Sequence, residues 1–506
     1  MTNWSRRSFL AAAAVLPVVV AACGSLSDPG SGPGSTVGDT LRISLSRSIK
    51  TINPYSVGSP DADRAVQGAV YSALTRTGAD GSTQPEIATS WREVDELTWQ
   101  FTLRQDAAFP DGTPLTSQDI LWNFGHLLDP ADTTQSGSKL RAFVSAVSLP
   151  QSEVLQFSLR EPATDLPGRL SLIYLTTAAF AANNNLDTAA WGTGPYRLDD
   201  IDLENGAQLS LNPHYFGPAP EFPAVAFSVL ASESARVAGL QSGEIDLALT
   251  IEPSNLPQFA DSHRTVLAPG PRAHTLAINE SHPALADPRV RRALNYGIDK
   301  QAIVSSIFGK DFPILPGQVL FGPYQDPAAG VGAYPYDPEQ AKALLAESGH
   351  GGGLSLEVSI PAGSYVAGET VVQAIAQQLA AIGVTLRLTP EADSFDRQAG
   401  PNPPDLAYIA WTTEYKGGYQ WLDYYTTTFS MSNTTDIGFD TLLTRALATG
   451  DPTTQRDLID RAVRRYHDEA DTVFLWPAPL TAVHSAALNW TPRVVVWPQE
   501  VTRART

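Results

Sequence analysis

The stretch FPDGTPLTSQD, residues 109–119, decides the local structure of the first third of the chain. Its Asp-Gly pair, Asp111-Gly112, supplies the chemistry of a tight turn, because glycine tolerates backbone conformations that other residues avoid. Residues 116–119 then offer a polar N-terminal cap for a helix whose apolar residues begin at Ile120. The stretch therefore predicts a turn that leads directly into a capped helix.

The same order of strand, turn and capped helix recurs along the chain. Residues 40–45 and 98–104 alternate between polar and apolar side chains, as half-buried strands do. Asp337-Pro338 opens a predicted helix over 341–347, and a second helix, over 370–382, ends at Gly383 before a strand over 384–388. A further helix is expected over 61–75. Alternating helices and strands predict an α/β fold with mixed sheets.

The N-terminus is predicted to be an export signal, residues 1–22. The pair Arg6-Arg7 precedes an apolar stretch over 9–22, which is shorter than the roughly 20 residues that a membrane-spanning helix needs. The paired arginines resemble a twin-arginine signal, although the general export route stays open. Residues 20–23, which end in Cys23, resemble the lipobox of bacterial lipoproteins, which implies cleavage and acylation at Cys23. Residues 23–38 would then form a lipidated, flexible tether.

Composition limits the classes of function. The net charge is −19, and loss of Arg6 and Arg7 with the signal would make it −21, so nucleic acid is excluded as a partner. Cys23 is the single cysteine, which excludes disulfides. The roughly 468 residues after the tether exceed what one core usually organises, so two or three lobes are expected.

The sequence gives no support for catalysis. It contains no Gly-x-Ser-x-Gly elbow, no phosphate-binding glycine loop with lysine and no His-Glu-x-x-His. The eight histidines show no pairing at i, i+4 of the kind that binds zinc on a helix. We therefore expect no enzyme activity, no cofactor and no dedicated metal site.

Several sequence blocks carry a resemblance to a known family. The blocks cover residues 85–91, 101–104, 109–119, 192–196, 240–246, 287–294 and 336–342. In this order they resemble the peptide/nickel-type (family 5) extracellular solute-binding lipoproteins of ABC importers. The resemblance covers about residues 40 to 490.

The resemblance implies a two-lobed, periplasmic-binding-protein-like fold of the class II type, with a subdomain inserted in the first lobe. Mapped onto this chain, lobe I takes residues 39–60, 168–268 and 480–506, and the inserted subdomain takes 61–167. Lobe II takes residues 269–479. Lobes of this kind close around a ligand by a hinge motion.

The family's ligand-binding residues map onto a few positions. Peptide-binding members hold the ligand's α-ammonium with the aspartate of a Trp-x-x-Asp segment, which here reads Trp411-Thr412-Thr413-Glu414. Glu414 would take that role with one extra methylene. Trp411, Thr412, Tyr55, Tyr365 and Tyr419 are the other expected ligand-binding residues, and Trp421 could add aromatic surface. The alternatives are a solvated loop acid for Glu414 and core packing for the aromatic residues.

Two departures from the dipeptide-binding pattern affect the expected specificity. The run after Glu414 reads YKGGY, residues 415–419, in place of the usual Gly-Asp-x-x-Asp-Pro continuation. The loop over 361–365 also lacks the arginine that dipeptide binders use for the ligand carboxylate. Longer peptides, or ligands without a free carboxylate, therefore fit better than free dipeptides.

The sequence thus predicts a receptor on the outer face of the cell membrane, in the periplasmic or cell-envelope space. It would capture an oligopeptide-like solute as a monomer and deliver it to an ABC permease and ATPase complex. The alternatives are a non-peptide solute, either a nickel chelate or an oligosaccharide, and a ligand-sensing receptor.

Overall fold

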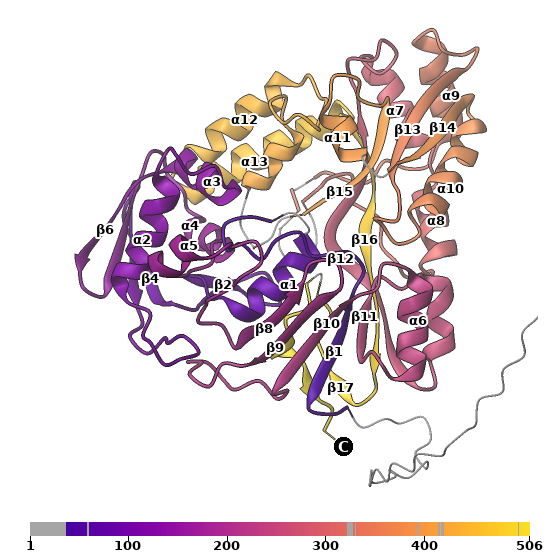
Figure 1. Ribbon diagram of the computed structural model, residues 1–506. Helices are drawn as coiled ribbons and strands as arrows, with labels where there is room; N and C mark the ends of the chain where they lie inside the picture. Colours follow the sequence, from indigo (N-terminus) through magenta and orange to yellow (C-terminus); the bar gives the residue numbers. More distant parts are fainter. Residues whose placement is uncertain are drawn as a thin grey trace, which may run out of the picture.

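The computed structural model describes residues 37–57, 60–320, 327–328, 330–391, 394–412, 415, 419–493 and 495–505, without the side chains of Pro60, Thr412, Gln420 and Trp421. Figure 1 shows two lobes joined by two long strands, β12 (His263–Ile278) and β16 (Thr472–Ser485). The two-lobed mixed α/β architecture confirms the predicted fold class. In the part of the chain described, no helix is long and apolar enough to cross a membrane.

The elements are grouped by the expected lobe I, inserted subdomain and lobe II. Residues from 168 on were expected in lobe I, but α4, η1 and α5 are grouped with the inserted subdomain because Leu166, Leu170 and Leu175 pack in its core. Lobe I contains β1 (Thr40–Leu45), α1 (Pro60–Val70), β8 (Tyr196–Asp202), β9 (Gly206–Leu211), β10 (Ala224–Val229), α6 (Glu233–Ser242), β11 (Leu247–Leu249), η2 (Pro253–Phe259), β17 (Leu488–Asn489), η4 (Pro498–Glu500) and β18 (Thr502–Arg503). The inserted subdomain and its connections contain β2 (Thr75–Thr77), β3 (Thr83–Pro85), β4 (Ala88–Asp95), β5 (Thr98–Leu103), α2 (Ser117–Leu128), α3 (Gln135–Phe143), β6 (Val144–Gln151), β7 (Val154–Leu159), α4 (Leu166–Arg169), η1 (Leu170–Leu172) and α5 (Ala178–Asn183). Lobe II contains α7 (Pro288–Tyr296), α8 (Lys300–Ile307), α9 (Pro338–Glu347), β13 (Leu354–Pro361), α10 (Gly368–Ala380), β14 (Val384–Glu391), α11 (Ser394–Ala399), β15 (Leu406–Thr412), η3 (Gln420–Tyr425), α12 (Ile437–Leu447) and α13 (Pro452–Asp468).

One ten-stranded sheet runs through both lobes, in the order β14-β13-β15-β12-β16-β11-β1-β10-β9-β8. The antiparallel pair β12 and β16 lies at its centre, where Pro269 faces Pro479 and the register shifts between Pro269 and Ala273. Proline donates no backbone hydrogen bond, so the ladder is weakest at this point. The lobe boundaries expected after residues 268 and 479 lie beside this proline pair and stay predictions.

The core of lobe I forms around β1, which pairs in parallel with β10 and β11. Helix α1 buries Ala62, Ala65, Val66 and Ala69 in the same core, together with Leu41 and Ile43 of β1. The predicted helix over 61–75 thus ends earlier, at Val70, and in its packing it belongs to lobe I. The separate core of the inserted subdomain gathers residues of β5, α2 and β7 and includes Leu74.

The stretch over residues 109–119 forms the predicted turn and capped helix. Gly112 adopts a φ of +85°, as the turn requires. Thr116 caps α2, since its side chain accepts a hydrogen bond from the Asp119 N–H at 3.1 Å and the Asp119 carboxylate accepts one from the Thr116 N–H at 3.0 Å. The capped helix then covers the four-stranded sheet β4-β5-β7-β6.

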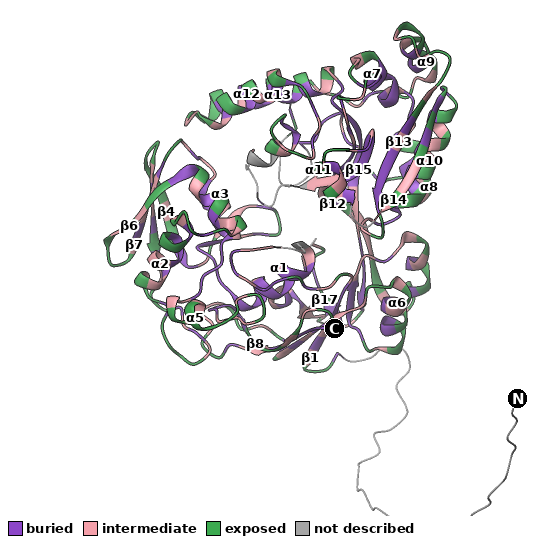
Figure 2. Ribbon diagram, turned by 45° about the horizontal axis from the view of Figure 1, so that its top comes forward, coloured by how far each residue is buried: buried purple, intermediate pink, exposed green. Residues whose placement is uncertain are grey.

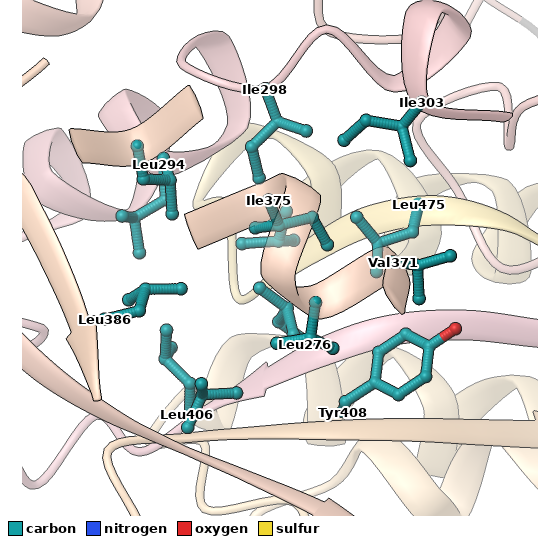
Figure 3. Packing of buried hydrophobic residues seen from close by; sticks show 14 of the residues in the cluster. Leu276, Leu294, Ile298, Ile303, Val371, Ile375, Leu386, Leu406, Tyr408 and Leu475 are labelled. Atoms are coloured by element: carbon teal, nitrogen blue, oxygen red, sulfur yellow. The ribbon is translucent and has the colours of Figure 1, made fainter. Parts of the chain in front are cut away.

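Lobe II has its own core between the sheet and the helices α7, α8 and α10. Figure 3 shows Val371 and Ile375 of α10 above Leu276 of β12, with Leu406 and Tyr408 of β15 close by. The predicted helix over 370–382 and strand over 384–388 correspond to α10 and β14. In Figure 2 the strands β13 and β15 of the large sheet are mostly buried, while the outer faces of α6 and α10 are exposed. The lobes thus fold around separate cores and share only the central strands.

Candidate functional site

A cavity lies where the two lobes meet, at the carboxyl end of β1 and beside the crossing of β12 and β16. It encloses about 920 Å³ including its open mouth. Its walls come from both lobes: Ser44–Arg47 at the end of β1, Gly270–Arg272 of β12, Ser364–Val366 after β13, and Ala478–Thr481 of β16. We refer to it as the hinge cavity, because movement of one lobe against the other would change its shape.

Three contacts join the lobes around the hinge cavity. Arg272 forms an ion pair with Asp61 of α1 at 2.5 Å. Arg47 donates a hydrogen bond to the Ser364 carbonyl at 3.2 Å. The Ala367 N–H donates to both carboxylate oxygens of Glu252 at 3.0 Å.

The Glu252 contact pairs a partly buried carboxyl of lobe I with a backbone N–H of lobe II. Burial raises the pKa of the Glu252 carboxyl, and Ala367 has a φ of +53°, which is unusual for a residue with a side chain. This strained N-terminus of α10 therefore offers its backbone N–H to an acid of the other lobe.

A second set of contacts joins lobe II to the inserted subdomain, at the outer rim. The Tyr415 hydroxyl donates to Asp165 at 2.9 Å, and the Thr164 hydroxyl donates to Gln455 at 3.4 Å. Gly168 lies directly under the Tyr415 ring, where a Cβ atom would approach Cδ2 of the ring to 2.4 Å. Only glycine permits this approach.

Asp423 of lobe II belongs to the same rim. Burial raises the pKa of the Asp423 carboxyl to about 6, and Arg169 of the inserted subdomain opposes the shift. The lobes therefore touch both at the hinge and at the rim.

Trp411 and Tyr419, two of the expected ligand-binding residues, pack on lobe II. Trp411 lies on β15 opposite Ala273 of β12. Its ring contacts Tyr424 at a centroid distance of 4.9 Å and Phe429 at 5.6 Å, and it is partly buried. Tyr419 is also partly buried against the same core cluster. Both residues thus have a packing role, and each retains some exposed surface.

Tyr365 lines the hinge cavity. Its hydroxyl accepts a hydrogen bond from the Ala410 N–H at 3.1 Å, and its ring lies edge-on to His274 at 4.7 Å. His274 in turn stacks on Tyr408 at 4.5 Å, and burial lowers its pKa to about 3. A neutral imidazole and the Tyr365 ring therefore form this wall of the cavity, and the buried Tyr408 ring supports the imidazole from behind.

Tyr55 does not line the hinge cavity. It is 1% exposed, its ring belongs to the core of the inserted subdomain, and its hydroxyl donates to Asn123 at 2.5 Å. In this conformation its side chain offers no surface to a ligand. The sequence placed Tyr55 correctly just after the first strand, but the direction of its side chain depends on the inserted subdomain, which the local pattern does not show.

Other expected residues lie outside what the structure describes. Glu414 and Cys23 are among them, and Thr412 is described only by its backbone, which pairs with Arg272 of β12. Trp421 is likewise described only by its backbone, within η3. Their roles stay predictions.

A second, larger cavity was not expected from the sequence. It encloses about 1890 Å³ including its open mouth and shares Asp61, Pro271 and Arg272 with the hinge cavity. Its other walls are parts of α1, β2, η1, the loop 215–218 and residues 493–500. We call it the lobe I cavity. Within the described ranges, no group of three or more His, Cys, Asp or Glu side chains is arranged to hold a metal ion.

A known protein family and several known proteins match most of the chain. The family described as bacterial extracellular solute-binding proteins, family 5 Middle, matches residues 82–433. The di/tripeptide-binding protein 2 of Pseudomonas aeruginosa is 25% identical over 472 residues, covering 85% of this chain and 88% of the relative. The nickel-binding periplasmic protein of Escherichia coli is 26% identical over 446 residues, covering 80% and 83%.

Solved structures share the fold. The structure of NikA from Brucella suis in complex with Fe(III)-EDTA has a TM-score of 0.81 at 22% identity, covering 92% of this chain and 100% of that one. The oligopeptide-binding protein AppA from Bacillus subtilis, in complex with a nonapeptide, has a TM-score of 0.77 at 18% identity, covering 92% and 99%.

Proposed function

Because this chain belongs to the bacterial extracellular solute-binding proteins of family 5, the substrate-binding components of ABC importers, we propose that it captures an oligopeptide-like solute between its two lobes. It then delivers the solute to a membrane permease. The match over residues 82–433 carries the proposal. The di/tripeptide-binding relative supports a peptide as the solute.

The contacts between the lobes support binding by closure rather than catalysis. The lobes share β12 and β16, meet around the hinge cavity, and touch again at the rim through Tyr415 and Asp165. Hinge closure of this kind removes a bound solute from water. On this proposal the protein releases its solute unchanged.

The ligand's amino terminus is proposed to bind Glu414, with Trp411, Thr412, Tyr365 and Tyr419 as further ligand-binding residues. An ammonium paired with a carboxylate forms a charge-assisted hydrogen bond, and removal of the carboxylate leaves the ligand charge unpaired. Glu414→Ala should therefore weaken binding of peptides with a free amino terminus at least tenfold and leave N-acetylated peptides nearly unchanged. Calorimetric titration of both peptide forms tests this, and equal losses for both would contradict the assignment.

A nickel chelate is the second candidate solute, favoured by the nickel-binding relative at 26% identity. Native mass spectrometry of protein purified without refolding distinguishes the candidates. A mixture of short peptides is the expected result, whereas a single metal complex or a single sugar would replace the peptide assignment. Turnover of the bound solute in the same sample would point to an enzyme instead.

We further propose that Cys23 is acylated and holds the protein at the outer face of the cell membrane through the tether of residues 23–38. The tether would keep the receptor close to its permease and raise its effective concentration there. Cys23→Ser should bind solute normally in solution and fail to support uptake in cells. Impaired binding in solution would contradict a purely anchoring role.

A further inference from the structure

Backbone strain lies on both sides of the Glu252 contact between the lobes. Among the residues that the structure describes, four that are not glycine have a positive φ, namely Thr250, Ala367, Asn433 and Ala470. Thr250, at +61°, lies two residues before Glu252 in lobe I, and Ala367, at +53°, is the residue of lobe II that Glu252 contacts. A side chain disfavours this region of the backbone, so such residues persist only where other contacts hold them there.

The lobe I side of the contact is held by partners within lobe I. The Thr250 N–H donates to the Thr481 carbonyl at 2.9 Å, and the Thr250 carbonyl accepts a hydrogen bond from Arg236 at 2.7 Å. The Glu252 N–H donates to the Glu233 carboxylate at 2.6 Å. Because these partners all belong to lobe I, this backbone keeps its shape when lobe II moves. Lobe I therefore presents the Glu252 carboxylate in a fixed position.

The lobe II side is held across the gap between the lobes. Ala367 is the N-terminal cap residue of α10, and its methyl group cannot accept a hydrogen bond as a capping side chain would. Its N–H donates to Glu252, whose negative charge also lies at the positive end of the helix. Both interactions favour the strained backbone of Ala367 only while the lobes are together. Separation of the lobes removes them, and the backbone of Ala367 can then relax to a negative φ.

We propose that Glu252 and Ala367 form a strained latch, in which closure of the lobes holds Ala367 at positive φ and relaxation of that backbone favours opening and release of the solute. The carboxylate stabilises the closed form, and the strain limits that stability. This inference rests on the hinge closure of the proposed function, and it adds a cause for the release of the solute.

Replacement of Ala367 by glycine tests the strain. Glycine adopts positive φ as readily as negative φ, so Ala367→Gly should stabilise the closed form. The added backbone freedom of glycine in the open form opposes part of this gain, and we expect half closure at an about threefold lower solute concentration.

The matched control for this replacement is Ala470→Gly. Ala470 is also a buried alanine with a φ of +53°, but it packs in a core of lobe II. Its strain is therefore the same in the open and closed forms. Ala470→Gly should change the stability of the fold and leave the solute concentration at half closure unchanged.

Removal of the carboxylate tests the other half of the latch. Glu252→Ala leaves the Ala367 N–H without this acceptor and should raise the solute concentration at half closure about tenfold. Glu252→Gln keeps an acceptor oxygen but loses the charge at the helix end, so its effect should lie between those of the wild type and Glu252→Ala. Thermal unfolding of each variant verifies that it folds.

Closure is measured by fluorescence energy transfer between dyes on the two sides of the gap. One dye is attached at Ser152→Cys, between β6 and β7 of the inserted subdomain, and the other at Thr444→Cys, on α12 of lobe II; both positions are exposed. Cys23→Ser removes the natural cysteine from the full mature chain. A mixed pentapeptide library is the first titrant, and a Ni(II)–histidine complex is the second.

The outcomes separate the latch from the proposed function. Closure by the Ni(II)–histidine complex but not by the library would replace the peptide as the solute, and the same variants would then test the latch with that complex. A half-closure concentration for Ala367→Gly that is not below those of the wild type and Ala470→Gly would overturn the latch and leave solute binding in place. Closure that Glu252→Ala does not weaken would also overturn it. Closure by neither titrant would contradict the proposed function and, with it, the latch.

Discussion

The wall of lobe II around Trp411 and the lobe I cavity differ in both charge and sequence origin. The rings packed around Trp411 are Phe395, Tyr424 and Phe429, all uncharged and within one segment of the chain. The arginines of the lobe I cavity are spread from residue 64 to residue 493. A sequence motif can therefore mark an aromatic wall, whereas a cluster of charges assembled from distant segments becomes visible only in the fold.

The largest expected effect is on stability, and it comes from replacing Trp411, whose role in packing is tested in this way. Its ring fills the space between Tyr424 and Phe429, so Trp411→Ala should leave a cavity and lower the free energy of unfolding by about 2–3 kcal/mol. Trp411→Phe should cost less than about 1 kcal/mol, because a ring is kept. Urea denaturation measures both. An unchanged stability together with lost solute binding would instead make the ring mainly a ligand-binding surface.

A smaller effect is expected at the rim, where Gly168 allows lobe II to approach the inserted subdomain. In Gly168→Ala the added methyl would lie 2.4 Å from Cδ2 of Tyr415, so the ring and its lobe must move. We expect about tenfold weaker solute binding and a larger radius of gyration in small-angle scattering of the solute-bound protein.

The matched control for Gly168 is Gly125, which is exposed on α2. Apart from its chain neighbours and its own helix backbone, no heavy atom of the described residues lies within 4 Å of the position of its Cβ. Gly125→Ala should leave solute binding unchanged and slightly stabilise its helix. Equal binding by the two variants would show that the rim contact does not contribute to closure.

Much of the fold could be predicted because its signals are local. The cap at Thr116 and the turn at Gly112 each depend on a few neighbouring residues, and both appear as expected. Helix α9 ends at Glu347 as predicted, whereas α10 begins and ends two residues before the predicted range of 370–382. The capping aspartate Asp337, for example, accepts a hydrogen bond from the Gln340 N–H at 2.9 Å. The family resemblance supplied the two-lobed arrangement, which local signals alone do not specify.

The candidate site was predicted less completely, because its features depend on long-range packing. The sequence pattern gives the position of Tyr55 but not the core that encloses it, which comes from α2 and β7. Likewise, Arg76 and Arg493 meet at Glu500 only because the C-terminal segment returns to β2. No spacing rule connects residues that are more than 400 positions apart.

The smallest expected effect is on the pH dependence of stability, and it comes from Glu86, an acid in the wall of the lobe I cavity. The Glu86 carboxylate accepts a hydrogen bond from the Ala73 N–H at 2.9 Å, and Arg76 and Arg104 also favour its ionised form, but burial dominates and raises its pKa from 4.5 to about 8. Between these two values the folded chain holds a proton that the unfolded chain releases, so stability should fall as pH rises through this window and level off above pH 8.

Glu86→Gln should remove this part of the pH dependence. Its unfolding free energy should exceed that of the wild type above pH 8 by on the order of 1 kcal/mol, because solvent in the cavity reduces the burial penalty. Urea denaturation at pH 6 and pH 9 measures the difference, and Glu153→Gln, at an exposed position between β6 and β7, is the control. Parallel pH profiles for wild type and Glu86→Gln would mean that Glu86 is ionised at neutral pH.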